Sequence, residues 1–312
     1  MSKYIAFFIL VVSLNACSVD YDIGDKLVSE RNFLVVNSYL SPQNPIEIEF
    51  YTTLKTDTGY WFQAAQNVRV VLKENDVVLY DAICSDSILS LDHYPKAGFS
   101  YSLEASYPNL EPIMASTSVP RAIDCKVRMD LDPEIGWSQR LVYLSDFKLS
   151  TSSQTSLWIT SYKLFENEEI VQYNEIYANN ILVDRININE GMGVLNPTVG
   201  SLCYDAFMRI KNTNLPKLQE IVFTPTHVGY YGSYRPDSKQ NRVAIKLITA
   251  SKDYDQYSKS LFQQKNMIVY DDDISAIIYQ PIAVHSNIKN GLGIFAGYNE
   301  SNHIFDTPKN NE

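Results

Sequence analysis

The sequence predicts an all-β protein with two folded regions. An immunoglobulin-like β-sandwich is expected over residues 31–122. A second, larger β-rich domain, which includes one short helix, is expected over residues 123–302. Short apolar segments recur about every 8 to 12 residues and are separated by turn residues, which is typical of sandwiches. Tyrosine, a residue that favours sheets, occurs 22 times. With 45% hydrophobic and 20% charged residues in 312, the composition is that of a folded protein.

Residues 1–16 are predicted to be a lipoprotein signal peptide. An apolar run at residues 5–12 follows Lys3 and is far shorter than the roughly 20 residues of a membrane-spanning helix. A small residue directly precedes Cys17, as in a bacterial lipobox. We expect acylation of Cys17, so that the mature protein is held to a membrane by lipid, with an acidic spacer at residues 17–30. A plain secretory signal is the alternative.

The predicted strands of the first region are short and apolar. In IEIEFY at residues 46–51, apolar side chains alternate with glutamates, which indicates a half-buried strand. Two apolar runs flank Glu74, Asn75 and Asp76, and this spacing predicts a hairpin. Because the antibody-type Cys-Trp-Cys framework is absent, only the sandwich architecture is predicted. Further strands are expected at FLVVNSYL (33–40), SYSLEASY (100–107) and residues 114–119.

The second region is also rich in strands but contains one helical pattern. A helix is predicted over residues 252–264, with Ser251 as its N-cap and acidic residues in its first turn. Its aromatic stripe is expected to pack on the second sheet and consists of Tyr254, Tyr257, Leu261 and Phe262. Residues 303–312 are expected to form a disordered tail. The predicted strands are RLVYLSDFKLS, TSLWITSYKLF, EIVQYNEIYA, AFMRIKN, EIVFTP and RVAIKLITA.

The residues that usually carry chemistry form no recognisable motif. The net charge of −10 argues against nucleic acid as a partner. Asp271, Asp272 and Asp273 are interpreted as a solvated loop, and no motif for a nucleophile, a phosphate or a metal ion is found. We therefore expect no enzyme activity, cofactor or metal site. Structural or exposed positions are expected for the histidines, which are His93, His227, His285 and His303.

Three cysteines remain besides Cys17, namely Cys84, Cys125 and Cys203. An odd number permits three different single disulfides and leaves one thiol free in each. We interpret all three as buried small hydrophobic residues, because neither a CxxC pair nor a zinc-type spacing is present.

Two aromatic loops are the candidate binding surface. Aromatic side chains with arginine often anchor interfaces, because they bury much area at little entropic cost. The alternative is that these rings close the ends of their own sandwiches. The first loop holds Tyr60, Trp61 and Phe62, and the second holds Tyr230, Tyr231, Tyr234 and Arg235.

The C-terminal segment SNIKNGLGIFAGYN contains three glycines, Gly291, Gly293 and Gly297. Their spacing does not match a phosphate-binding loop, and we predict a bulge or a close approach of two backbones. Together with LVVNSYLS, YSLEASYPNLEPIMASTSVP, SLCYDAF and KDYDQYSKSLFQQ, taken in chain order, this segment resembles the Bacteroidota outer-membrane lipoproteins grouped as domain of unknown function 4249 (DUF4249). The resemblance covers about residues 17–300. It departs at Tyr204, where a tryptophan is expected after the cysteine.

The resemblance implies a partner rather than a reaction. Such lipoproteins are typically encoded beside TonB-dependent transporters, which implies a non-enzymatic accessory or binding subunit of such an outer-membrane barrel. Asp20 and Asp22 resemble the signal that exports lipoproteins to the cell surface, although Tyr21 interrupts them. The alternatives are an envelope structural or adhesive module and, less favoured, a glycan or peptide hydrolase.

Overall fold

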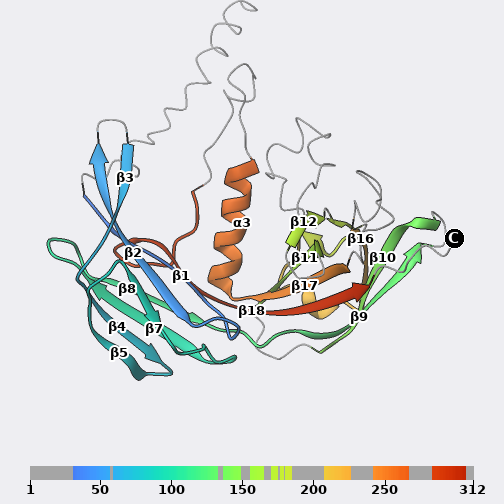
Figure 1. The fold of residues 1–312 in the computed structure, drawn as a ribbon, viewed down its shortest axis with the longest axis horizontal. Coiled ribbons are helices and arrows are strands. Elements are labelled where there is room, and N and C mark those ends of the chain that lie inside the picture. Colours follow the sequence, from blue (N-terminus) through green and yellow to red (C-terminus); the bar gives the residue numbers. More distant parts are fainter. Residues whose placement is uncertain are drawn as a thin grey trace, which may run out of the picture.

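The computed structural model describes residues 31–56, 59–132, 136–148, 155–164, 170–174, 176–178, 180–184, 207–225, 242–266 and 283–306. Within these residues strands predominate, and they are accompanied by one α-helix and one short 3-10 helix (Figure 1). The predicted all-β fold class is therefore confirmed.

The strands form three sheets. The largest has the order β14-β15-β11-β17-β18-β1-β2-β3, with β12 attached to β11 and β6 attached to β2. The two smaller sheets have the orders β5-β4-β7-β8 and β13-β16-β10-β9. Each smaller sheet packs against one half of the large sheet, so the described chain consists of two sandwiches side by side.

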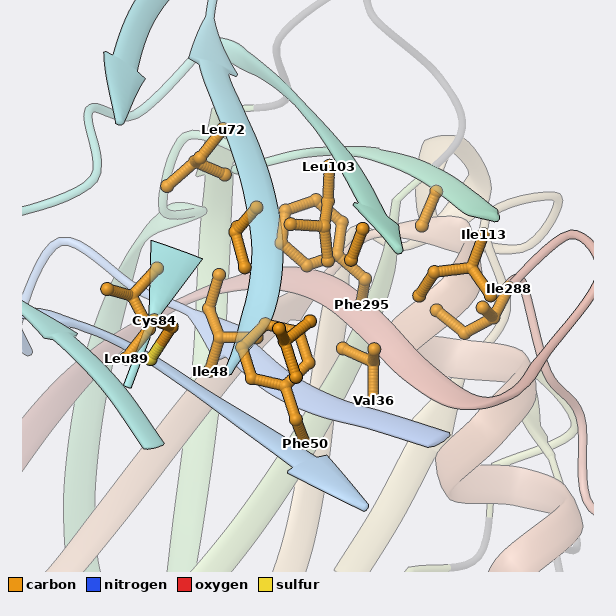
Figure 2. Close-up of a cluster of buried hydrophobic side chains, with 14 of the residues drawn as sticks. Val36, Ile48, Phe50, Leu72, Cys84, Leu89, Leu103, Ile113, Ile288 and Phe295 are labelled. Carbon is orange, nitrogen blue, oxygen red and sulfur yellow. The ribbon is translucent and has the colours of Figure 1, made fainter. Parts of the chain in front are cut away.

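The first sandwich has a core formed by alternating side chains of both layers. Val36, Ile48 and Phe50 from the large sheet meet Leu72 and Leu103 from the smaller sheet (Figure 2). The period of two places each apolar set on one face, as the pattern IEIEFY predicts. The strands are β1 (Leu34–Leu40), β2 (Ile46–Thr56), β3 (Gly59–Ala64), β4 (Val68–Glu74), β5 (Val77–Cys84), β6 (Ile88–Leu91), β7 (Ser100–Ser106) and β8 (Ile113–Ser118).

Two local features of this sandwich bear on the sequence predictions. The hairpin at Asn75 and Asp76 is confirmed, because both residues have positive φ (45° and 67°) and connect β4 to β5 directly. The segment at residues 59–64, predicted to be a loop, forms β3 instead. It pairs with β2 because β2 continues to Thr56, beyond the predicted end of its apolar pattern.

The last strand, β18 (Leu292–Asp306), belongs to both sandwiches. Residues 292–297 pair in parallel with β1, and residues 298–306 pair antiparallel with β17 (Arg242–Ala250). Phe295 is fully buried in the first core. Residues 303–306, assigned to the tail from the sequence, thus continue a strand in the second sandwich. The boundary at residue 122 stays a prediction. Two residues from the far end of the chain, Ile288 and Phe295, belong to the first core.

The glycines of this segment allow backbones to approach closely, as predicted. A Cβ at Gly293 would lie 2.0 Å from the Val36 carbonyl oxygen, and φ there is +100°. A Cβ at Gly297 would lie 2.2 Å from the carbonyl oxygen of Ser118. Both positions therefore require glycine.

The second sandwich encloses a separate core. Leu157, Ile159 and Ile245 from the large sheet contact Leu144 and Phe223 from the smaller one. Its further elements are β9 (Asp124–Asp132), β10 (Gly136–Lys148), β11 (Ser156–Leu164), β12 (Ile170–Asn174), β13 (Ile176–Tyr177), β14 (Val183–Asp184), β15 (Phe207–Ile210), β16 (Glu220–Pro225) and the 3-10 helix Leu215–Lys217.

The predicted helix is present as α3 (Lys252–Asn266), on the face of the large sheet opposite the two cores. Ser251 Oγ accepts a hydrogen bond from the Tyr254 backbone N–H (3.3 Å), which confirms the N-cap. Phe262 stacks on Trp158 of β11, with ring centroids 5.9 Å apart. In the first half of the helix, Tyr254 and Tyr257 contact Tyr39 of β1, so α3 packs against strands of both sandwiches.

Candidate functional site

The hairpin formed by β2 and β3 exposes two of the predicted binding residues. Leu54 lies opposite Trp61, and Thr53 lies opposite Phe62, so the two aromatic side chains point to opposite faces. Trp61 is 65% exposed and Phe62 is 64% exposed. These values do not fit the alternative that the two rings close the end of their own sandwich. We call Leu54, Trp61 and Phe62 the aromatic hairpin.

The face of this hairpin that carries Trp61 continues the core-facing side of β2. Ile48 and Phe50 are fully buried on that side, and Leu54 follows them at the same period. Leu54 is 42% exposed, because the hairpin extends past the part of the sheet that the opposite layer covers. An apolar surface that is normally internal is thus open to solvent at this end of the molecule.

β3 also ends the strand order of the large sheet in the part of the chain that is described. Its sequence, GYWFQA, contains no charged residue and no proline. Natural proteins usually protect such edges with these residue types, since an open edge can pair with another chain. The aromatic hairpin therefore combines two exposed aromatic side chains with an edge that no other described strand covers.

The N-terminal segment joins the fold beside this hairpin. The Phe33 N–H donates a hydrogen bond to Thr53 Oγ1 (2.7 Å), and the Thr53 N–H donates to the Phe33 carbonyl oxygen (2.9 Å). Residues that follow the predicted spacer are thus attached to β2 directly next to Leu54.

The other sequence-predicted site residues are only partly placed. Tyr60 lies in β3. Five of them lie outside the described residues, so their position relative to the hairpin is not defined: Cys17, Tyr230, Tyr231, Tyr234 and Arg235.

A polar cleft beside α3 was not identified from the sequence. It has a volume of about 600 Å³ and lies between one face of α3 and the end of β15. The face of the helix carries Lys252, Gln256, Lys259 and Gln263, and the opposite wall includes Arg209. The sequence does indicate that the predicted helix has a polar side. It does not indicate that Arg209 on β15, 46 residues from Asp255, faces that side.

The base of the cleft is a buried ion-pair network. Asp255 accepts hydrogen bonds from Trp158 Nε1 (2.8 Å) and Arg209 Nε (2.7 Å) and also pairs with Arg209 Nη2. Asp184 pairs with Arg209 Nη1 and with Lys211 Nζ (3.1 Å). Both carboxylates are therefore paired with cationic side chains of the protein itself.

The network sets the charge of its members. Burial alone would lower the pKa of Arg209, but the contacts with Asp255 and Asp184 outweigh it and raise the pKa. Burial likewise would raise the pKa of Asp184, and the hydrogen bond from Lys211 with the charge of Arg209 lowers it instead. Arg209 and Asp184 are thus charged at neutral pH.

Cysteines and histidines of the described chain have structural surroundings. Cys84 is buried in the first core, and Cys125 is half-buried against the second, where burial raises the pKa of its thiol to about 11. Both are free thiols; Cys203 lies outside the described residues. His93 contacts Glu74. In the described ranges, no group of three or more His, Cys, Asp or Glu side chains is placed to hold a metal ion.

Fold and site together define a β-protein of two sandwiches fused through one strand, with an exposed aromatic hairpin and a polar cleft. The chain belongs to the family described as domain of unknown function DUF4249, whose sequence model matches residues 18–304. The predicted family is therefore confirmed. No curated protein matches the chain. In the described residues, no helix has the length and apolar character needed to span a membrane.

The C-terminal segment SNIKNGLGIFAGYN, which carried part of the family resemblance, is held by side-chain hydrogen bonds near the junction of the two sandwiches. The Asn287 side chain accepts a hydrogen bond from the Phe295 N–H (3.0 Å) and donates one to the Phe295 carbonyl oxygen (2.7 Å), like a short neighbouring strand. Asn299 Nδ2 donates to the Pro120 carbonyl oxygen (3.0 Å). The Gly297 N–H donates to Thr117 Oγ1 (3.0 Å). These contacts give the motif a structural role.

Proposed function

We propose that this protein is a lipid-anchored outer-membrane lipoprotein, exposed on the cell surface, that serves as a non-enzymatic accessory or binding subunit of a TonB-dependent transporter. The observation that carries the proposal is the aromatic hairpin, which is exposed, pairs with no further strand of the described residues at its edge, and lies next to the point where the N-terminal segment joins the fold.

The length of the spacer supports this arrangement. Residues 17–30 comprise 14 residues, which reach at most about 50 Å when fully extended. An acyl anchor on Cys17 would therefore keep the aromatic hairpin within about that distance of the leaflet. A membrane protein in the same leaflet is then within reach, and Trp61 is of the residue type that most often dominates binding energy at interfaces.

The anchor can be tested separately from the partner. Wild-type protein and the variant Cys17→Ser are expressed with a radiolabelled fatty acid, and membranes are separated from soluble fractions. We expect label and membrane attachment only in the wild type. Equal labelling or equal membrane attachment of the two would contradict the proposed anchor.

The partner can be tested by co-purification from gently solubilised membranes. The double variant Trp61→Ala/Phe62→Ala is expected to reduce recovery of a co-purifying transporter at least tenfold. The matched control is Val77→Ala/Ile83→Ala, which truncates two equally exposed apolar side chains on β5, in the opposite sheet. A wild-type protein that elutes alone, or equal losses in both variants, would count against the hairpin as the docking surface.

An envelope structural or adhesive module is the second candidate. The fusion of two sandwiches through one strand favours it, because a shared strand makes a stiff spacer. A deletion strain with normal solute uptake but defective surface assembly or attachment would favour this candidate over the first.

A further inference from the structure

The polar cleft beside α3 has one wall of regularly spaced side chains. Lys252, Gln256, Lys259 and Gln263 are spaced by four, three and four residues, so they form one ridge along the helix. With a rise of 1.5 Å per residue, the ridge is about 16 Å long. It presents amine and amide groups alternately to the cleft.

The cleft is positively charged in an acidic protein. Among the described residues, Lys252, Lys259 and Arg209 line the cleft together with one carboxylate, Asp255, and the ion-pair network at its base adds Lys211 and Asp184. Four cationic side chains thus face two anionic ones, in a chain of net charge −10. Asp255 pairs with Arg209, and Asp184 pairs with Arg209, with Lys211 and, at 3.7 Å, with Lys259. Lys252 forms no ion pair within the described ranges.

The walls of the cleft are held in place by contacts within the protein. Asp255 attaches α3 to both β11 and β15 through Trp158 and Arg209. Phe262, on the same helix, packs on Trp158 of β11 and on Phe207 of β15. A preformed wall lowers the ordering cost of binding. The volume of about 600 Å³ is in the range of small-molecule sites.

We propose that this cleft binds a small polar anion, one that carries a carboxylate or a phosphate on a scaffold rich in hydroxyl groups. The anionic group is placed between Lys252 and Lys259, and the hydroxyl groups form hydrogen bonds with the amides of Gln256 and Gln263. The inference names a ligand class for the binding role proposed above. It is carried by the cleft alone, so it can be tested without the transporter.

The test compares three probes that share one scaffold: glucuronate, glucose 6-phosphate and uncharged glucose. Each is titrated into the purified full-length protein in detergent, and binding is measured by calorimetry or by ligand-observed NMR. We expect the two anions to bind at least tenfold more tightly than glucose, with an affinity that falls as salt concentration rises. The stronger of the two anions identifies the charged group.

Variants locate the site. Lys252→Gln/Lys259→Gln is expected to weaken binding of both anions at least tenfold. The control Arg69→Gln/Lys73→Gln removes the same charge from β4 in the first sandwich, where both side chains form exposed ion pairs. It is expected to leave binding unchanged. Circular dichroism of each variant checks folding.

Three results would overturn the inference: equal affinity for glucose and the anions, unchanged binding in the cleft variant, or equal losses in the cleft and control variants. None of them affects the co-purification result. Failure of this inference is therefore distinguishable from failure of the proposed transporter partnership.

Discussion

At the scale of single residues, Glu74 shows how hydrogen bonds can outweigh burial. The carboxylate is almost fully buried at the end of β4 and accepts a hydrogen bond from the Tyr101 hydroxyl (2.6 Å). Lys96 Nζ and His93 Nε2 each lie 2.9 Å from it. Burial raises its pKa, but the hydrogen bonds from Tyr101, Lys96 and His93 together lower it to about 2.

This environment makes the free energy of unfolding depend on pH in the acidic range. The folded pKa of Glu74 lies below its unfolded value of 4.5, so its contribution is present above about pH 4.5 and is lost as pH falls towards 2. We expect Glu74→Gln to lower the free energy of unfolding by about 1–3 kcal/mol at pH 7. The difference from wild type should shrink at pH 3. Urea titrations at both pH values measure it.

The matched control for this prediction is Glu104→Gln. Glu104 forms an exposed pair with Lys73, so its replacement should change stability by less than about 1 kcal/mol. A difference between Glu74→Gln and wild type that is the same at pH 7 and pH 3 would show that the carboxylate charge is not what stabilises this site.

At the scale of elements, α3 contributes one buried charge, Asp255, to its contact with the sheet, beside its aromatic contacts. Removing one partner of a buried ion pair typically costs about 3–5 kcal/mol, because the other charge stays buried. We expect Asp255→Asn to destabilise the protein by this amount and to speed hydrogen exchange in α3 first. Both can be followed by urea unfolding and by hydrogen exchange with mass spectrometry.

Asp253→Asn provides the comparison, because Asp253 lies in the same helical turn but is partly exposed beside His285. We expect this variant to behave nearly as wild type. If both variants lose equal stability, the effect comes from the charge at the start of the helix and not from the contact with Arg209.

Elements with a local period could be predicted from the sequence, and contacts between distant segments could not. The helix was predicted to within two residues of its C-terminal end, because Ser251 and the aromatic stripe are local signals. The Arg209–Asp255 contact carries no local signal. The exposure of Trp61 depends on where the opposite sheet ends, and aromatic residues are as common inside sandwiches as on binding surfaces.

At the scale of the whole molecule, β18 connects the two cores. Nothing in its sequence indicates that its first half pairs with β1, more than 250 residues earlier in the chain. Such a shared strand is expected to make the two sandwiches unfold together rather than as separate domains.

Phe295→Ala tests this coupling. Phe295 is fully buried in the first core, and its truncation should cost about 3–5 kcal/mol. If the sandwiches are coupled, the slowest amides of β17 in the second sandwich should lose as much protection as those of β4 in the first. Loss confined to β4 would show that the sandwiches unfold independently.

The central claim is that the aromatic hairpin contacts a transporter, and site-specific photo-crosslinking in living cells tests it most directly. A photoreactive amino acid is placed at position 62 and, as a control, at position 77, which is equally exposed on β5. The account predicts a crosslink to a TonB-dependent transporter from position 62 and none from position 77. Absence of any crosslink from position 62, or equal crosslinks from both positions, would contradict it.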